Sequence, residues 1–201
     1  MGKELLLWVK KIREIKRKWI MEKAYEYVDQ FDDFVLRKLD DYDDLKIYRF
    51  KDFDLQRVRE LLKFNQEAFG QDAIDKFAAI FQIYYGNIFV LKERRNDAKI
   101  LGIANFSRAW DENKLAYLSD YAIAEEARGQ SIGKEFLGIV LEDIKNQGFQ
   151  RVQLTVDPDN EPALALYESL GFKKDKFVEK LYGPGEDRYI MDLDLDQLQR
   201  D

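Results

Sequence analysis

The order in which strand-like and helix-like segments follow one another constrains the fold of this 201-residue chain most. From residue 45 onward, alternating apolar and polar residues predict strands, and apolar residues at three- and four-residue steps predict helices. The predicted strands cover residues 45–50, 88–92, 99–110, 115–124, 151–156, 172–182 and 188–195, and the predicted helices cover 55–64, 71–83, 131–146 and 161–170. Short turns between successive strands imply antiparallel hairpins. We therefore expect an α/β (α+β) domain with a mixed, mainly antiparallel central sheet and helices on both faces.

Residues 1–45 differ from the rest of the chain in periodicity and charge. Their apolar residues recur at helical spacing, and Lys and Arg dominate residues 3–23 whereas Asp and Glu dominate residues 26–44. The apolar stripe comprises Leu5, Trp8, Ile12, Ile15, Trp19, Tyr27, Phe31, Phe34 and Val35. We expect a helical N-terminal extension over 1–45, packed on the domain 46–201 or on a second subunit in a possible homodimer. A helix that binds a membrane surface or a partner protein, as in an adaptor, is the alternative.

The chain contains neither Cys nor His, which excludes several kinds of chemistry. Disulfides, thiolate nucleophiles, Ser-His-Asp triads and zinc sites with thiolate or imidazole ligands are ruled out. We therefore expect no metal, and we assign acid–base work to carboxylates, Tyr, Lys or water. The net charge of −6 argues against a large nucleic-acid interface. The longest early apolar run, Leu5 to Val9, is too short for a secretory signal or a membrane-spanning helix, so we expect a cytoplasmic protein without a membrane span.

Residues 118–134 combine a strand, a tight turn and the first turn of a long helix. The N–H groups at a helix N-terminus and the positive end of the helix dipole favour a phosphate or pyrophosphate. Gly129 and Gly133 remove side chains where the backbone has to approach such a ligand. The alternative is a strand–helix turn without a ligand. The candidate cofactor-binding residues of this loop are Arg128, Gly129, Gln130, Ser131, Ile132, Gly133 and Lys134.

Two motifs in this half of the chain resemble those of the GNAT superfamily of N-acetyltransferases. The segment Arg128-Gly-Gln-Ser-Ile-Gly133 resembles the Arg/Gln-x-x-Gly-x-Gly/Ala loop with which this family binds the pyrophosphate of coenzyme A, although Ser131 replaces the fourth-position Gly. The segment from Asn160 to Phe172 is similar to the family's Asn-x-x-Ala-x-x-Leu-Tyr-x-x-x-Gly-Phe motif at every named position. The strand order extends the resemblance to residues 46–195.

The resemblance implies an acetyl-CoA site and an acid. Coenzyme A is expected in a splayed gap between the strand that ends near Ile123 and the strand 151–156, with backbone contacts at Tyr121 and Ile123. Asn160 is expected to cap its helix and to bind coenzyme A, or to act as a cap only. Tyr167 corresponds to the family's Tyr near the thioester sulfur, where its phenol can protonate the departing thiolate. The alternative for Tyr167 is a core aromatic.

The base and the acceptor are less constrained by the sequence. Asp120 is charged within an otherwise apolar strand, and Glu67 lies between the first two helices, where the family's acceptor site begins. Each is a candidate catalytic base, and a structural Asp120, a solvated Glu67 or a relay through water are the alternatives. The segment from Tyr182 to Met191 is similar to the Tyr-x-x-Gly-Glu-Asp-x-x-x-Met hairpin of N-terminal protein acetyltransferases, in which the Tyr flanks the peptide's α-amine; a hairpin without function is the alternative.

These residues predict an acetyl-CoA-dependent N-acetyltransferase that acts on a primary amine, with Glu67 and Tyr182 as candidate acceptor-binding residues. We place a small-molecule amine first among the acceptors, and a protein α-amine or lysine second. A non-catalytic coenzyme A-binding regulatory module is the alternative from another class of function.

Overall fold

The computed structural model describes residues 34–36, 45–50, 55–93, 99–129 and 131–199 of the chain. Eight strands form one sheet in the order β1-β2-β3-β4-β5-β6-β8-β7. The strands are β1 Phe34–Leu36, β2 Leu45–Arg49, β3 Asn87–Glu93, β4 Ile100–Arg108, β5 Leu115–Ile123, β6 Arg151–Val156, β7 Lys173–Val178 and β8 Arg188–Asp194. Only β5 and β6 pair in parallel, and all other neighbours are antiparallel. The expected mixed, mainly antiparallel sheet is thus confirmed.

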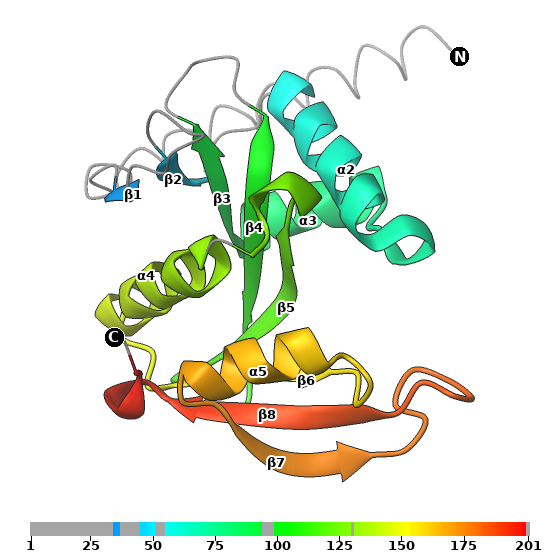
Figure 1. The fold of residues 1–201 in the computed structure, drawn as a ribbon, viewed down its shortest axis with the longest axis vertical. Helices are drawn as coiled ribbons and strands as arrows, with labels where there is room; N and C mark the ends of the chain where they lie inside the picture. Colours follow the sequence, from blue (N-terminus) through cyan, green and yellow to red (C-terminus); the bar gives the residue numbers. More distant parts are fainter. Residues whose placement is uncertain (1–33, 37–44, 51–54, 94–98, 130, 200–201) are drawn as a thin grey trace, which may run out of the picture. The chain divides into compact units, whose positions relative to one another are not determined.

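Helices cover both faces of this sheet (Figure 1). The described part of the chain holds the α-helices α2 Leu55–Phe69, α3 Lys76–Tyr85, α4 Ile132–Asn146 and α5 Glu161–Ser169, and the 3₁₀ turns η1 Gly70–Asp72, η2 Glu125–Ala127 and η3 Leu195–Gln197. One core cluster joins residues of α2 and α3 to Ile103 of β4. The next residue, Ala104, pairs with Tyr121 of β5, whose ring stacks on Phe136 of α4 at a centroid distance of 6.1 Å. Because neighbouring strand residues point to opposite faces, α4 lies across the sheet from α2 and α3.

The first two helices differ from their predicted bounds. The predicted helix 71–83 begins only at Lys76, because Asp75 is its N-cap and accepts hydrogen bonds from the N–H groups of Phe77 at 2.9 Å and Ala78 at 2.8 Å. Helix α2 continues beyond its predicted end, since Ala68 and Phe69 still pack against the core cluster.

The strand β1 corrects the helical prediction for Phe34 and Val35. Phe34 pairs with Ile47 and Val35 with Lys46, antiparallel to β2. The backbone groups on this side of β2 pair with β1, and a helical spacing of apolar residues along the chain gives no sign of such a strand partner. Residues 1–33 lie outside the described residues, so the division of the chain near residue 45 stays a prediction. In the described part of the chain, no helix is long and apolar enough to cross a membrane.

Candidate active site

Strands β5 and β6 separate before either of them ends. Their parallel ladder runs from the pair Leu115 and Arg151 to the pair Leu118 and Leu154, and no further. On its other side β5 stays paired with β4 as far as Ile123. The backbone of residues 119–123 therefore has one edge without a strand partner, and such an edge can pair with an extended ligand. This divergence agrees with the splayed gap expected from the sequence.

The loop after β5 brings left-handed backbone to the N-terminus of α4. Gly129 has φ of +78° and Ser131 has φ of +60°, and Gln130 between them lies outside the described residues. Ser131 is the N-cap residue of α4, but its side chain makes no capping hydrogen bond. The Arg128 Nε donates to the Ile123 carbonyl at 3.0 Å, which ties the loop back to the end of β5. The arrangement suits an anion, because the first N–H groups of a helix have no partners inside the helix.

Gly133 has a packing role that the sequence did not reveal. A Cβ atom there would lie 3.0 Å from the Tyr121 Oη and 3.3 Å from the Ile123 Cγ1. The Tyr121 Oη donates to the Gly133 carbonyl at 2.7 Å, and burial raises the pKa of Tyr121 well above its usual value, so this donor keeps its proton. Gly133 therefore lets α4 approach β5 closely. Ile132 is buried, which leaves only its backbone for the cofactor contact predicted for it.

Tyr167 lies on α5 with 7% of its surface exposed. Its ring meets those of Tyr121 and Phe172 edge-on, with centroid distances of 6.5 and 5.6 Å. Burial, with a smaller contribution from Tyr117, raises the pKa of Tyr167, so the phenol stays protonated at neutral pH. Within the described part of the chain its hydroxyl has no hydrogen-bond partner. A protonated phenol with an unused donor is suited to give a proton to a departing group.

Asn160 confirms one of its two predicted roles. Its Oδ1 accepts from the Ala163 N–H at 3.1 Å and so caps α5. The side chain is exposed, and a contact with coenzyme A stays a prediction.

Three hydroxyl groups meet where the β5–β6 ladder ends. We call Tyr117, Thr155 and Tyr182 the hydroxyl triad. The Thr155 Oγ1 lies 2.9 Å from the Tyr117 Oη and 3.0 Å from the Tyr182 Oη, and the two phenols are 3.3 Å apart. Burial, with smaller contributions from neighbours that include Asp120, raises the pKa of Tyr117 to about 12. Sequence reasoning missed Tyr117 and Thr155; the available signal was a hydroxyl on each of the two strands that flank the expected gap.

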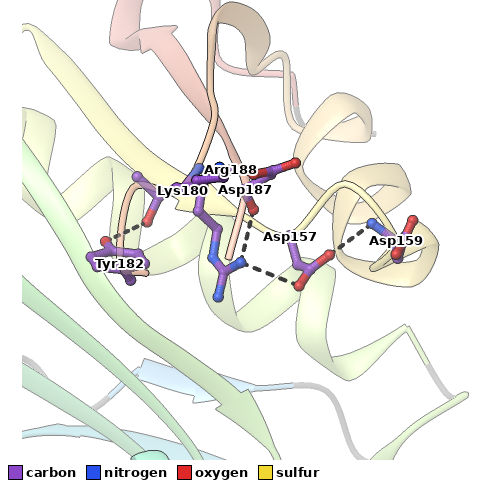
Figure 2. A network of polar contacts seen from close by, with 7 residues as sticks. Asp157, Asp159, Lys180, Tyr182, Asp187 and Arg188 are labelled. Carbon is purple, nitrogen blue, oxygen red and sulfur yellow. Dashed lines mark hydrogen bonds and ion pairs between the residues drawn. The ribbon is translucent and has the colours of Figure 1, made fainter. Parts of the chain in front are cut away.

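The loop that carries Tyr182 is tied to the end of β6 by polar contacts (Figure 2). Arg188 reaches Asp157, with its Nη1 3.3 Å from the Asp157 Oδ2, and also donates to the Asp187 carbonyl at 2.8 Å. The Asp187 Oδ1 accepts from the Lys180 N–H at 2.8 Å. The Arg188 guanidinium lies 5.4 Å from the centroid of the Tyr182 ring. Tyr182 is 58% exposed, and these contacts hold it beside the strand ends.

The two candidate bases lie in different surroundings. Asp120 is half-buried and accepts hydrogen bonds at its Oδ2 from Asn105 at 2.8 Å and Ser119 at 3.2 Å. Glu67 is exposed on α2 and pairs with Lys63 at 3.9 Å. Among the described residues, Glu67 forms no hydrogen bond or ion pair with another predicted site residue. The geometry therefore favours Asp120, and both assignments stay predictions.

Comparisons with known proteins agree with this geometry. The profile of the Acetyltransferase (GNAT) family matches residues 55–172. The chain is 39% identical over 77 residues to N-alpha-acetyltransferase 30 of Schizosaccharomyces pombe. This match covers 37% of this chain and 51% of that protein. The chain is also 33% identical over 84 residues to Mycothiol acetyltransferase of Streptomyces coelicolor. This match covers 42% of this chain and 26% of that protein. The chain thus spans about half of the first relative and about a quarter of the second.

A solved structure with a similar fold is the ribosomal-protein-S18-alanine N-acetyltransferase from Escherichia coli. Its TM-score is 0.62 at 22% identity, and the match covers 78% of this chain and 96% of that one.

Proposed function

The chain belongs to the Acetyltransferase (GNAT) family, and on this premise we propose that it is an N-acetyltransferase that moves the acetyl group of acetyl-CoA to a primary amine. The proposal depends on one observation above all. Strands β5 and β6 diverge after Leu118 and Leu154, with buried phenols on one side of β5 and the Asp120 carboxylate on the other. In the balanced reaction the amine nitrogen forms an amide bond as the thioester C–S bond breaks. One ammonium proton goes to the thiolate and a second goes to solvent.

The residues around the gap fit acetyl-CoA, which supplies an activated acetyl group as its thioester. The open backbone edge of residues 119–123 offers partners to the amides of an extended ligand. The left-handed backbone at Gly129 and Ser131 turns the chain into the N-terminus of α4, where N–H groups favour a pyrophosphate. Lys134, in the first turn of this helix, adds positive charge.

The chain's own groups divide the proton transfers between them. Tyr167 keeps its proton because it is buried; it donates that proton to the departing thiolate and regains one of the protons that the ammonium releases, through solvent. Asp120 accepts a proton from the acceptor amine. Burial raises the pKa of Tyr117 to about 12, with a small contribution from the Asp120 charge, so Tyr117 is uncharged at neutral pH.

We infer that the acceptor is the α-amine of a polypeptide rather than the small molecule placed first on the sequence alone. The observation that favours this choice is the position of Tyr182. Its exposed ring stands at the rim of the gap, and its hydroxyl bonds to Thr155 and Tyr117. A ring in this position can flank the first residue of an extended chain. The partial match to N-alpha-acetyltransferase 30 supports the same class of acceptor.

A thiol-release assay with acetyl-CoA and a panel of amines tests the proposal. The panel pairs peptides that have free N-termini with the same peptides blocked at the N-terminus, and adds a lysine side chain and a polyamine. We expect release of coenzyme A with free N-termini only, and mass spectrometry should place the acetyl group on the α-nitrogen. Turnover confined to small amines would overturn the acceptor class. Binding of acetyl-CoA without turnover on any amine would instead indicate a regulatory module.

A further inference from the structure

A β-bulge decides on which face of the sheet Asp120 lies. In the β4–β5 ladder, Asn105 pairs with Asp120 and Phe106 pairs with Leu118, so Ser119 is an extra residue on β5. Side chains alternate along a strand, and one extra residue turns the following side chains to the opposite face. Asp120 consequently comes to lie beside Asn105 and the helix α3 instead of beside α4.

Three donors converge on one oxygen of the Asp120 carboxylate. Its Oδ2 lies 2.8 Å from the Asn105 Nδ2, 3.2 Å from the Ser119 Oγ and 3.4 Å from the Gln82 Nε2. The Ser119 hydroxyl has one proton and also lies 3.1 Å from the Asn105 carbonyl, so the two amides are the dedicated donors. Within the described residues, the other oxygen, Oδ1, accepts no hydrogen bond and is not one of the buried polar atoms without a partner. The carboxylate is therefore held through Oδ2 and presents Oδ1.

We propose that Asn105 and Gln82 are positioning residues that hold Asp120 so that its Oδ1 faces the acceptor amine. This inference rests on the proposed function, in which Asp120 takes a proton from that amine. Both amides direct their N–H groups to the carboxylate, and in the described part of the chain the Asn105 Oδ1 and the Gln82 Oε1 are buried without partners. Leaving buried carbonyl oxygens unpaired costs stability, so packing alone does not explain these side chains.

Burial makes Asn105 the more informative of the two amides. It is 2% exposed, and a leucine of similar size would fill the same space without an unpaired oxygen. Gln82 approaches Asp120 from α3, and Asn105 approaches it from β4. The titratable neighbour on β5 is Tyr117, which carries no charge at neutral pH because burial raises its pKa to about 12. In the described part of the chain, the hydrogen bonds to the carboxylate thus come from neutral groups.

A double-mutant cycle tests whether Asn105 acts through Asp120. We expect Asp120→Asn to lower kcat by about 10² to 10⁴-fold, and Asn105→Leu or Gln82→Met to lower it on the order of tenfold with little change in the acetyl-CoA KM. In the Asp120→Asn background, Asn105→Leu should have no further effect. The matched control is Asn65→Leu, because Asn65 is also a buried amide but bonds to the Ile74 N–H at 2.8 Å. The fold-decreases in kcat caused by Asn65→Leu and by Asp120→Asn should multiply in the double variant, because the two residues act independently.

A second measurement does not depend on turnover. Three-bond NMR couplings of Asp120 should report one χ1 rotamer in the wild-type protein and averaging between rotamers in Asn105→Leu. Multiplicative effects of Asn105→Leu and Asp120→Asn on kcat would overturn the positioning role. So would a single Asp120 rotamer in both Asn105→Leu and Gln82→Met. If the wild-type protein acetylates no amine, the proposed function fails by itself, and the rotamer measurement still decides whether the amides hold the carboxylate. Gln82→Met serves as the second variant should Asn105→Leu fail to fold.

Discussion

Strand β5 presents Tyr121 to the face covered by α4 and Asp120 to the face covered by α3, and the two side chains are held in different ways. Tyr121 is packed among rings and donates to the backbone carbonyl of Gly133, a residue of the candidate phosphate loop. Asp120 accepts hydrogen bonds from side chains of three different elements, namely α3, β4 and β5. We call the α4 side of β5, proposed for acetyl-CoA, the cofactor face, and the α3 side, proposed for the amine, the acceptor face. The proposed cofactor face is built mainly from backbone conformation and buried phenols, whereas the proposed acceptor face depends on side chains that only the fold brings together.

This difference has a consequence for how each face responds to substitution. Backbone groups at the splay and at the start of α4 survive most side-chain changes, so the cofactor face should be sensitive at the few positions where bulk or a proton matters. The acceptor face should respond to the loss of any one polar partner, because an anchored carboxylate or a shared hydroxyl leaves another group unpaired.

The largest expected effect is that of Tyr167→Phe on the chemical step. The substitution keeps the ring packing and removes the hydroxyl, so kcat should fall by about 10² to 10⁴-fold while the acetyl-CoA Kd stays within about twofold. Rapid-quench single-turnover kinetics and calorimetry measure the two quantities. If single-turnover rates match those of the wild-type protein, Tyr167 is a core aromatic, and the cofactor face contributes no acid.

The dependence of stability on alkaline pH tests the surroundings of Tyr117, a member of the hydroxyl triad. A phenol whose pKa is about 12 in the folded protein and about 10 when unfolded loses stabilisation as pH rises from about 10 to 12, because the unfolded chain ionises first. The free energy of unfolding should fall by at most about 2 to 3 kcal/mol on this account. Urea titrations at several pH values measure it, and Tyr117→Phe should flatten the fall. An equal slope in the variant would mean that Tyr121 and Tyr167 carry the whole effect.

The smallest expected effects are those of two substitutions at Gly133, which distinguish the role of packing from that of charge. Gly133→Ala places a Cβ against Tyr121 and Ile123, so we expect a loss of stability of about 1 to 3 kcal/mol. Gly133→Asp adds negative charge at the start of α4, and it should weaken acetyl-CoA binding more than Gly133→Ala does. Thermal melts and calorimetry on both variants give the comparison. Equal acetyl-CoA affinities in the two folded variants would contradict the proposal that the pyrophosphate binds at the N-terminus of α4.

Local chemistry accounts for what was predictable from the sequence. The strand Arg151–Val156 has its predicted bounds, since its alternation of apolar and polar residues matches its burial pattern. Asn160 caps α5, and Gly171 has φ of +98° just after that helix ends. The motifs from Arg128 to Gly133 and from Asn160 to Phe172 resemble those of the family to which the chain belongs. Each of these features depends on residues that are near one another in the chain.

Tertiary structure alone decided the rest. Tyr117, Thr155 and Tyr182 are 38 and 27 residues apart in sequence, and no local spacing links their hydroxyls. The extra residue Ser119 in the β4–β5 ladder moves Asp120 to the α3 face, and a bulge is a property of two strands in register, not of either strand alone. The sequence by itself therefore pointed to the family, to the succession of strands and helices after residue 45, and to a candidate cofactor loop. Which side chains meet at the acceptor face was settled by strand pairing, because hydrogen bonds between side chains depend on distances that only the assembled sheet defines.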